Sequence, residues 1–520
     1  MTLPRRTLLA GALACVALLT AAPAQAGDVI LVDGDRAERV EDPLVPAGPA
    51  VDVAPARATA GVATTARRST RSRQRARASS SSRRRARARA KRARRATSRA
   101  LRRAVRREAI SPKRFRSYRR IVMRARRVLR RLRGARGREL GAVVALVDRI
   151  ALRHGLRPSR LPALMLTLRR NTQYWPRQPF PYDRDHVMFR GSRIVFEYYA
   201  GEGLQLQPLV NFKQANLMHG ACVKDTGEPC DRRGLRRLLR ELLRTAAHRG
   251  GSKAWEYYFE FGGGTPPWIS GMAQATAIQA LARASDLLAD ERYLAHARAS
   301  LGAFEKPPPA GVRTTGPFGG THYLQYSFAP RLYIVNAFLQ SLIGLWDYAQ
   351  LTGDRRARRL FDDAEPHARR ELIASDIGDW STYSYRGAES TREYHELLRE
   401  FAASLCSRLR RKPYCEIARD FLAYTTDPAE VELLGPVSAT KGEDTRVRFF
   451  ISKLSAVQVT ITRAGKAVYD RTKTFRRGEG SVAWTPRRPG PHRIRVAAKE
   501  LRTGQELRTS VAEPVEVARP

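Results

Sequence analysis

Three times between residues 269 and 424, a long apolar segment is followed by a short turn and then by an amphipathic segment. A helix that is apolar on nearly all sides has to be buried, and a helix with one apolar stripe can cover it. The expected inner helices are 269–288, 331–351 and 391–409, and their outer partners are 291–304, 355–372 and 416–424. Because such hairpins stack into a closing ring, we expect a mainly α fold, an α/α toroid or incomplete α/α barrel with a central cleft.

Helical patterning begins well before these hairpins. Ser111 and Pro112 are typical of a helix start, since serine caps a first turn and proline fits its first position. Apolar residues then recur at helical spacing, and they do so again in segments 138–153, 205–219 and 231–247. We therefore assign residues 111–427 to one helical domain.

The end of the chain follows a different pattern. From about Val431 onward apolar and polar residues alternate, which predicts strands with one buried face. The expected strands are 447–451, 456–462, 468–475, 481–484, 492–498 and 506–511. So many short strands indicate a small all-β immunoglobulin-like or fibronectin-like sandwich over residues 428–520, with Trp484 in its core and no catalytic constellation.

The charge of the chain is concentrated near its beginning. The sequence has 96 Lys and Arg against 49 Asp and Glu, and residues 51–140 alone hold 34 basic and 3 acidic side chains. Because like charges repel, residues 27–110 are predicted to be a disordered basic arm rich in Arg, Ala and Ser, with transient helix as an alternative in its Arg- and Ala-rich part. The arm either binds an anionic cell-wall or surface polymer or serves as a solvated linker. Without aromatic residues between the arginines, sequence-specific nucleic-acid recognition is not expected.

The first residues have the layout of an export signal. Arg5 and Arg6 precede an apolar run at 8–19 that ends in Ala24-Gln25-Ala26, so residues 1–26 are predicted to be a signal peptide. The arginine pair is compatible with the twin-arginine route and also with an ordinary positive flank. No later apolar run approaches the roughly 20 residues of a membrane span. We expect a secreted or extracytoplasmic protein, soluble or held at the cell surface by charge.

Four cysteines remain after this signal, as two close pairs. Cys222 lies near Cys230 and Cys406 lies near Cys415, so export favours two local disulfides, although four cysteines formally allow three connectivities. A zinc site is the alternative, but spacings of eight and nine residues are wider than in common zinc knuckles. No metal site is predicted.

The loops that precede the inner helices are rich in aromatic and polar residues. They are 255–268, 318–326 and 379–386, and the last leads to Tyr394 and His395. Flat aromatic rings pack on sugar rings, and Arg or His side chains bind carboxylates. These loops therefore favour an acidic glycan as the ligand, while the alternative is that the aromatic side chains only close the ends of the barrel.

These loops resemble the catalytic domain of the D-glucuronyl C5-epimerases. The resemblance covers roughly residues 203–424, beginning with a first barrel helix at 207–219. The matching pieces are 268–274, Tyr323, Tyr326, 336–338, 341–347, Tyr383, Arg386, Tyr394 and His395. The resemblance implies an isomerase that inverts C5 of D-glucuronate units in a polysaccharide to give L-iduronate, with no cofactor.

The resemblance also implies roles for individual residues. Tyr383 and Tyr394 match the catalytic tyrosines, and Arg386 and His395 are expected to supply the positive charge that stabilises a phenolate. The residues expected to contact substrate are Tyr323, Tyr326, Arg386, His395, Trp268, Tyr258, Glu260 and Asn336.

One position departs from the family. Gln325 stands where the family has a glutamate, and an amide cannot accept a proton from carbon. The base is then Glu393, Glu260 or a tyrosine, or else the reaction is lost. Two further functions stay open: a uronate lyase, which shares the first proton abstraction, and a non-catalytic protein that binds acidic glycans.

Overall fold

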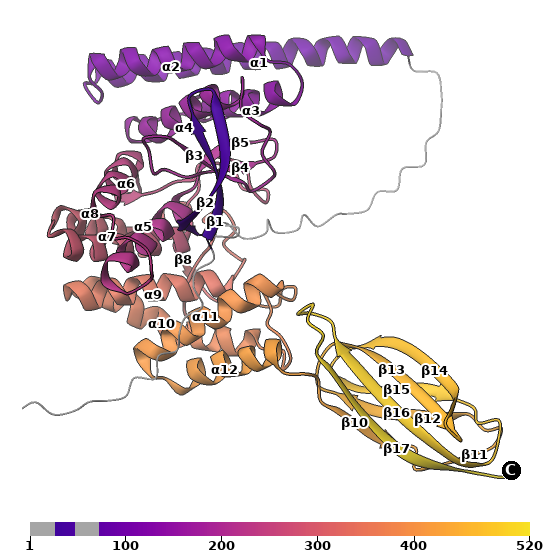
Figure 1. The fold of residues 1–520 in the computed structure, drawn as a ribbon. Helices are drawn as coiled ribbons and strands as arrows, with labels where there is room; N and C mark the ends of the chain where they lie inside the picture. Colours follow the sequence, from indigo (N-terminus) through magenta and orange to yellow (C-terminus); the bar gives the residue numbers. More distant parts are fainter. Residues whose placement is uncertain (1–25, 47–71) are drawn as a thin grey trace, which may run out of the picture.

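The structure is a computed structural model, and it describes residues 26–46 and 72–520. Figure 1 shows basic helices at one end, a body of paired helices in the middle and a β-domain projecting from the other end. The predicted signal peptide lies outside the described residues except for Ala26. No helix of the described residues is both long and apolar enough to cross a membrane.

A five-stranded sheet is built from two distant parts of the chain. The hairpin of β1 and β2 joins β3, β4 and β5 in the order β2-β1-β3-β4-β5, and β1 runs parallel to β3. The strands are β1 (Ala26–Asp33), β2 (Arg36–Pro46), β3 (His186–Phe189), β4 (Phe196–Tyr199) and β5 (Gly203–Leu206). Val29, Ile30 and Val32 of β1 are buried. The prediction of disorder is therefore wrong for residues 27–46, because their alternating apolar residues complete a sheet.

The basic segment that follows contains a helix. Helix α1 (Ser72–Arg106) packs on α3 (Gly134–Leu152), with α2 (Pro112–Arg131) and α4 (Leu161–Tyr174) completing the layer. Its buried residues are Ala93, Ala96, Thr97, Leu101 and Ala104. They form one stripe at helical spacing, and Thr97 donates a hydrogen bond of 2.5 Å to Asp148. Disorder is thus wrong here too, and the helical alternative holds for residues 72–106. Alanine favours helix and the stripe gives the helix a surface to pack on, while the described arginines of α1 stay exposed.

Paired helices form the body of the protein. Each inner helix, α5, α7, α9 and α11, is followed by an outer helix that packs against it. The pairs are α5 (Pro208–Val223) with α6 (Arg232–Thr245), α7 (Gly271–Leu288) with α8 (Arg292–Ser300), α9 (Val335–Thr352) with α10 (Arg355–Ser375), and α11 (Arg392–Leu409) with α12 (Lys412–Thr426). The three predicted hairpins are confirmed. Nearly all of α7 is buried, as its apolar pattern requires.

The inner helices run in the same direction. Residues in their C-terminal halves meet, because Gln279 of α7 contacts both Asn216 of α5 and Asp347 of α9, and Arg408 of α11 also binds Asp347. The N-terminal ends of all four helices therefore lie at one end of the bundle. The loops rich in aromatic residues enter there.

Both predicted disulfides are present. Cys222 pairs with Cys230 between α5 and α6, and Cys406 pairs with Cys415 between α11 and α12. Each bond therefore ties an inner helix to its outer partner.

Residues 431–518 form the β-domain, which consists of two sheets. One has the order β10-β12-β15 and the other the order β11-β17-β16-β13-β14. The strands are β10 (Val431–Gly435), β11 (Ser438–Thr440), β12 (Thr445–Ile451), β13 (Ser455–Arg463), β14 (Lys466–Phe475), β15 (Gly478–Trp484), β16 (Gly490–Glu500) and β17 (Arg508–Ala518). All six predicted strands are present, and Trp484 lies in the core as expected.

Candidate active site

An aromatic cluster occupies the N-terminal end of the inner helices. Its rings come from the loops before α7 and α9 and from β4, and they include Tyr199, Phe259 and Tyr326. Trp268 stacks on Tyr257 with ring centroids 4.2 Å apart, while their backbones exchange hydrogen bonds of 2.8 and 3.1 Å. Because these rings pack on one another, Trp268 and Tyr326 lie inside the cluster and are at most 1% exposed.

The two tyrosines expected to be catalytic lie together. The ring centroids of Tyr383 and Tyr394 are 5.2 Å apart, and Tyr383 packs against the aromatic cluster. Tyr394 belongs to the first turn of α11, whereas Tyr383 belongs to the loop between α10 and α11. The start of α9 holds that loop, since the amide of Val335 donates to the carbonyl of Tyr383 at 3.4 Å. Two separate elements therefore bring the phenols to one place.

An ion pair between the half-buried Arg184 and the buried Glu197 was not predicted. Arg184 donates to Glu197 of β4 at 2.7 Å, and Gln207 donates to the other carboxylate oxygen at 3.0 Å. The Arg184 guanidinium lies 4.6 Å from the ring centre of Tyr199. Arg184 also has a left-handed backbone with φ of 75°, a conformation that is costly outside glycine and is often found at functional sites.

Charge interactions connect this pair to the tyrosines. Burial tends to lower the pKa of Arg184, but Tyr199, Glu197 and Tyr394 are among the groups that raise it above the usual value. Burial raises the pKa of Glu197 to about 7, against the opposing influence of Arg184 and Gln207. One sequence signal could have indicated this site, because Glu197 is a lone carboxylate within the apolar run 194–199.

Two buried amides near the cluster have unused hydrogen-bonding atoms. Gln325 accepts a bond of 2.9 Å from Ser270, but its Nε2 has no partner among the described residues. Asn336, in the first turn of α9, is 2% exposed, and neither its Oδ1 nor its Nδ2 has a hydrogen-bond partner there. Since buried polar groups are nearly always paired, these atoms are suited to bind polar groups of a ligand.

His395 does not supply a positive charge, so that prediction is wrong. The ring is fully buried between two aromatic rings. Its centroid lies 3.8 Å from that of Trp380 and 4.8 Å from that of Phe421. Its Nδ1 contacts the Ser381 hydroxyl at 2.8 Å, and its Nε2 contacts the Phe421 carbonyl at 3.0 Å. Burial lowers the pKa of His395 to about 4, so the ring is neutral at pH 7.

Three other predicted residues are exposed. Glu393 and Glu260 are exposed, and Glu260 pairs with Arg149 at 3.5 Å. Arg386 is also exposed and lies over the ring of Tyr385.

Two predicted tyrosines have structural contacts instead. The Tyr323 hydroxyl donates to the Leu360 carbonyl at 2.7 Å, inside the helical core. Tyr258 donates to Glu256 at 3.0 Å, and Arg160 and Arg249 also bind that carboxylate. Their phenols thus have protein partners away from the tyrosine pair.

The fold and the site define a protein of paired helices with a tyrosine pair and a half-buried arginine at one end of its inner helices. Residues 249–422 match the family described as D-glucuronyl C5-epimerase C-terminus. The match includes Trp268, Gln325, Tyr383 and Tyr394, whereas Arg184 and Glu197 precede it.

Comparisons with individual proteins cover parts of the chain. A D-glucuronyl C5-epimerase of Caenorhabditis elegans is 41% identical over 87 residues, which are 16% of this chain and 14% of that protein. An uncharacterised protein of Methanocaldococcus jannaschii is 27% identical over 151 residues, 28% of this chain and 49% of that protein. The chain thus spans about half, or less, of these curated relatives. Among solved structures, cellobiose 2-epimerase from Bacillus thermoamylovorans aligns over 56% of this chain and 74% of that chain, with 10% identity and a TM-score of 0.33.

Proposed function

We propose that the protein is an isomerase that epimerises C5 of D-glucuronate units in an acidic polysaccharide, giving L-iduronate. The observation that carries this proposal is the Tyr383–Tyr394 pair, with ring centroids 5.2 Å apart, beside Arg184. The match of residues 249–422 to the epimerase family supports it. In this proposal the helical pairs form an incomplete α/α toroid and the β-domain is an immunoglobulin-like sandwich.

The reaction needs two proton-transfer groups and one cation. The C5 proton is weakly acidic, so the adjacent carboxylate has to be neutralised while negative charge moves onto it. One tyrosine, as phenolate, removes the C5 proton, and the other returns a proton to the opposite face of the ring. Arg184 pairs with the substrate carboxylate and stabilises the phenolate. Glu197 holds the guanidinium in place, and Gln207 orients the Glu197 carboxylate by donating to it.

This assignment answers the question raised by Gln325. Glu393 and Glu260 are exposed, and in this proposal the tyrosines carry out the proton transfers. The unpaired amide atoms of Gln325 and Asn336 then bind sugar hydroxyls instead of moving protons.

A second candidate function follows from the same position. An amide in place of the family's carboxylate also suits a protein that binds acidic glycans without turning them over. In that case the site binds the polymer, but no hydrogen exchanges at C5.

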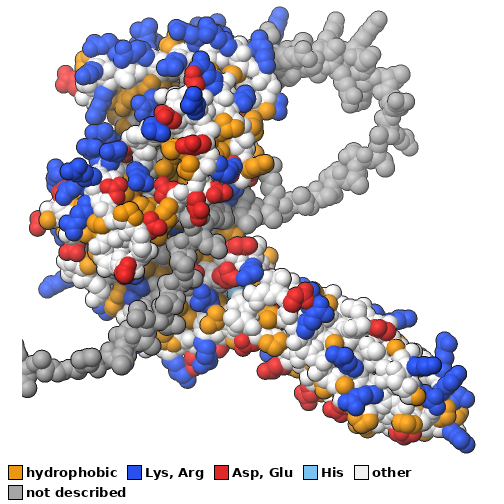
Figure 2. All heavy atoms as spheres, in the orientation of Figure 1, with side chains coloured by type: hydrophobic (Ala, Val, Ile, Leu, Met, Phe, Trp, Pro, Cys, Tyr) orange, Lys and Arg blue, Asp and Glu red, His pale blue; other side chains and the backbone are white. Residues whose placement is uncertain are grey.

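We also propose export and attachment to an anionic polymer. Figure 2 shows Lys and Arg side chains gathered over α1 and α2, where α2 alone holds ten basic residues and no acidic one. Two disulfides agree with an extracytoplasmic location. An acidic cell-wall or surface polymer fits this basic face.

The decisive experiment follows hydrogen exchange at uronate C5 in deuterated water by NMR, across a panel of uronic-acid polymers. Exchange without chain cleavage supports the epimerase, and Tyr383→Phe or Tyr394→Phe should abolish it. Cleavage with a new unsaturated chromophore would instead indicate a lyase. Binding without C5 hydrogen exchange on any polymer would refute the isomerase and support the second candidate function, a glycan-binding protein.

A further inference from the structure

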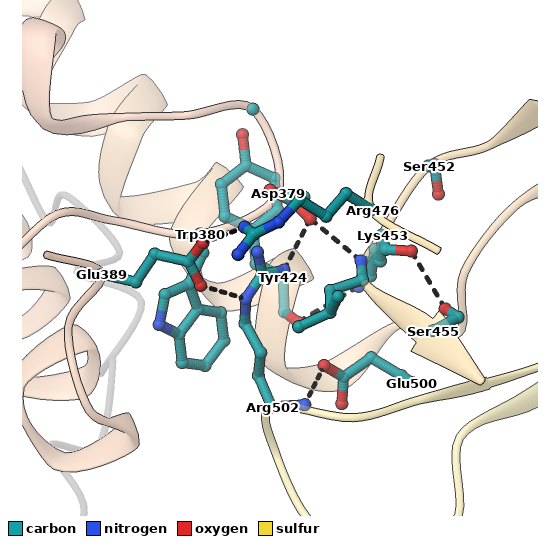
Figure 3. Close-up of polar contacts among 12 residues, drawn as sticks. Asp379, Trp380, Glu389, Tyr424, Ser452, Lys453, Ser455, Arg476, Glu500 and Arg502 are labelled. Atoms are coloured by element: carbon teal, nitrogen blue, oxygen red, sulfur yellow. Dashed lines mark hydrogen bonds and ion pairs between the residues drawn. The ribbon is translucent and has the colours of Figure 1, made fainter. Parts of the chain in front are cut away.

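The loop that carries Tyr383 touches the β-domain. This loop, residues 376–391 and here named the Tyr383 loop, connects α10 to α11. Figure 3 shows side chains of the β-domain converging on both of its ends. Such contacts are unexpected for an appended domain that only binds a surface.

Arg502 joins the two ends of the Tyr383 loop. Its Nη1 lies 2.5 Å from a carboxylate oxygen of Asp379, and its Nε donates to Glu389 at 3.1 Å. The Arg502 side chain is only 8% exposed, and its guanidinium lies 5.7 Å from the ring centre of Trp380. One buried guanidinium therefore fixes the distance between residues near each end of the loop.

The backbone that presents Arg502 is itself held. Glu500, which is 1% exposed, accepts hydrogen bonds from the amides of Arg502 at 2.5 Å and Thr503 at 2.9 Å. Asp379 accepts a further bond of 3.0 Å from the amide of Leu454. The contact is therefore built from ordered groups on both sides.

Two packing contacts lead from Arg502 to Tyr394. The Arg502 guanidinium lies over the Trp380 ring. Trp380 in turn stacks on His395, with ring centroids 3.8 Å apart and an angle of 9° between the ring planes. The Trp380 indole also donates to the Ser390 carbonyl at 2.8 Å, which closes the Tyr383 loop. His395 directly follows Tyr394 in α11, so the same stack that receives Arg502 sets the start of that helix.

A second anchor holds the β-domain against the helices. Lys453 is 6% exposed, and its ammonium donates to the carbonyls of Ala423, Tyr424 and Asp427 at the end of α12. Arg392, at the start of α11, donates to the Thr503 carbonyl at 2.7 Å. The interface thus consists of directional polar contacts, which fix orientation more narrowly than an apolar surface does.

We propose that the β-domain is part of the catalytic unit and that Arg502 is a positioning residue, which holds the Tyr383 loop so that Tyr383 stays against Tyr394. This inference rests on the proposed function only for its effect on turnover. The ordering of the Tyr383 loop by Arg502 can be measured without any substrate.

The test compares Arg502→Ala with Arg476→Ala in the full chain. Arg476 also binds Glu389, at 2.6 Å, but its side chain is 76% exposed, so it is a matched surface control. Hydrogen/deuterium exchange by mass spectrometry should show amides of 376–391 exchanging at least about tenfold faster in Arg502→Ala, with the β-domain core unchanged. Arg476→Ala should change the exchange less than about twofold.

Kinetics on C5 hydrogen exchange provide the second measurement. A displacement of the loop by about 1 Å should lower kcat about 100-fold, while KM changes less than about threefold. Arg502→Lys keeps the charge and should recover part of kcat. If Arg502→Ala does not fold, Asp379→Asn weakens the same contact from the helical side, because it removes the negative charge that pairs with Arg502.

The two measurements separate the two proposals. If the amides of 376–391 exchange no faster in Arg502→Ala or Asp379→Asn, or if they do and kcat stays the same, the positioning role is wrong. If the unmodified chain exchanges no C5 hydrogen but the loop loosens as expected, the proposed reaction fails while the ordering of the loop by Arg502 stands.

Discussion

Both ends of the inner helices contain polar side chains that are largely shielded from solvent. Only at one end do these side chains form a closed hydrogen-bond network. At the C-terminal end, Asp347 accepts hydrogen bonds from Gln279, Arg283 and Arg408 at 2.7 to 2.9 Å. At the N-terminal end, Gln325 and Asn336 keep amide atoms without partners among the described residues. A closed network stabilises the bundle, whereas unused groups cost folding free energy unless a ligand binds them. The comparison therefore separates residues kept for stability from residues kept for function.

The largest effect is expected for a phenol at the N-terminal end. Tyr394→Phe should lower the rate of C5 exchange about 1,000-fold, because it removes a proton-transfer group. Urea denaturation should show an unfolding free energy within about 1 kcal/mol of the original chain. Tyr348→Phe, toward the other end of α9, removes a hydroxyl that contacts Asp354 at 3.3 Å and should keep nearly full activity. Equal losses in both variants would contradict the division between the two ends.

The opposite result is expected at the C-terminal end. Asp347→Ala should lower the unfolding free energy by about 3 kcal/mol, because Arg283 and Arg408 lose their shared buried partner. The rate of C5 exchange below the melting temperature should stay within about twofold. Asp420→Ala, which removes an exposed pair with Arg419, should cost less than about 0.5 kcal/mol. A loss of activity without a loss of stability in Asp347→Ala would overturn this assignment.

The free energy of unfolding should depend on pH through Glu197, which pairs with Arg184 at the N-terminal end. Burial raises the pKa of Glu197 from the ordinary 4.5 to about 7, so between these values the folded chain binds this proton more tightly than the unfolded chain. The contribution of Glu197 to stability is therefore full below pH 4.5 and is lost as pH rises toward 7. Comparing urea denaturation of the original chain and Glu197→Gln across this range should reveal a difference on the order of 1 kcal/mol. An identical pH profile in both chains would show that Glu197 titrates normally.

At the N-terminal end, the smallest effect on activity is expected at Asn336. Because its amide has no partner, Asn336→Leu should change the unfolding free energy by less than about 1 kcal/mol, while KM rises about tenfold. Asn211→Leu is the matched control, since the Asn211 amide pairs with the backbone of Val195 at 2.8 and 2.9 Å. That control should cost at least about 2 kcal/mol by leaving buried backbone groups unpaired. Similar losses of stability in the two variants would contradict the distinction between the unpaired amide of Asn336 and the paired amide of Asn211.

Local patterns predicted most of the helices and strands. The apolar inner helices and the alternating strands of the β-domain can be read from spacing, because each buries a face of its own. The hairpin β1–β2 was missed because its partner β3 lies far along the chain. Helix α1 was expected at most as a transient helix, because charge repulsion was given more weight than its stripe of alanines.

The site was predictable only in part. Tyr383 and Tyr394 were identified through the family resemblance, and the structure brings them together. Arg184 was not found, because it comes from the turn before β3 and pairs with Glu197 of β4 only in the folded chain. The charge of His395 was wrongly predicted because its burial depends on Trp380 and Phe421, which spacing alone does not place around it.

The parallel pairing of β1 with β3 determines the topology of the basic segment. Val29 pairs with His186, so everything between the two strands is an insertion closed at both ends, not a free tail. Removing part of it would shorten a closed loop and alter how β1 reaches its place in the sheet. The described arginines of α1 are held to the body of the protein by the packing of α1 on α3, and a polymer bound to them would lie at a defined position relative to the tyrosine pair.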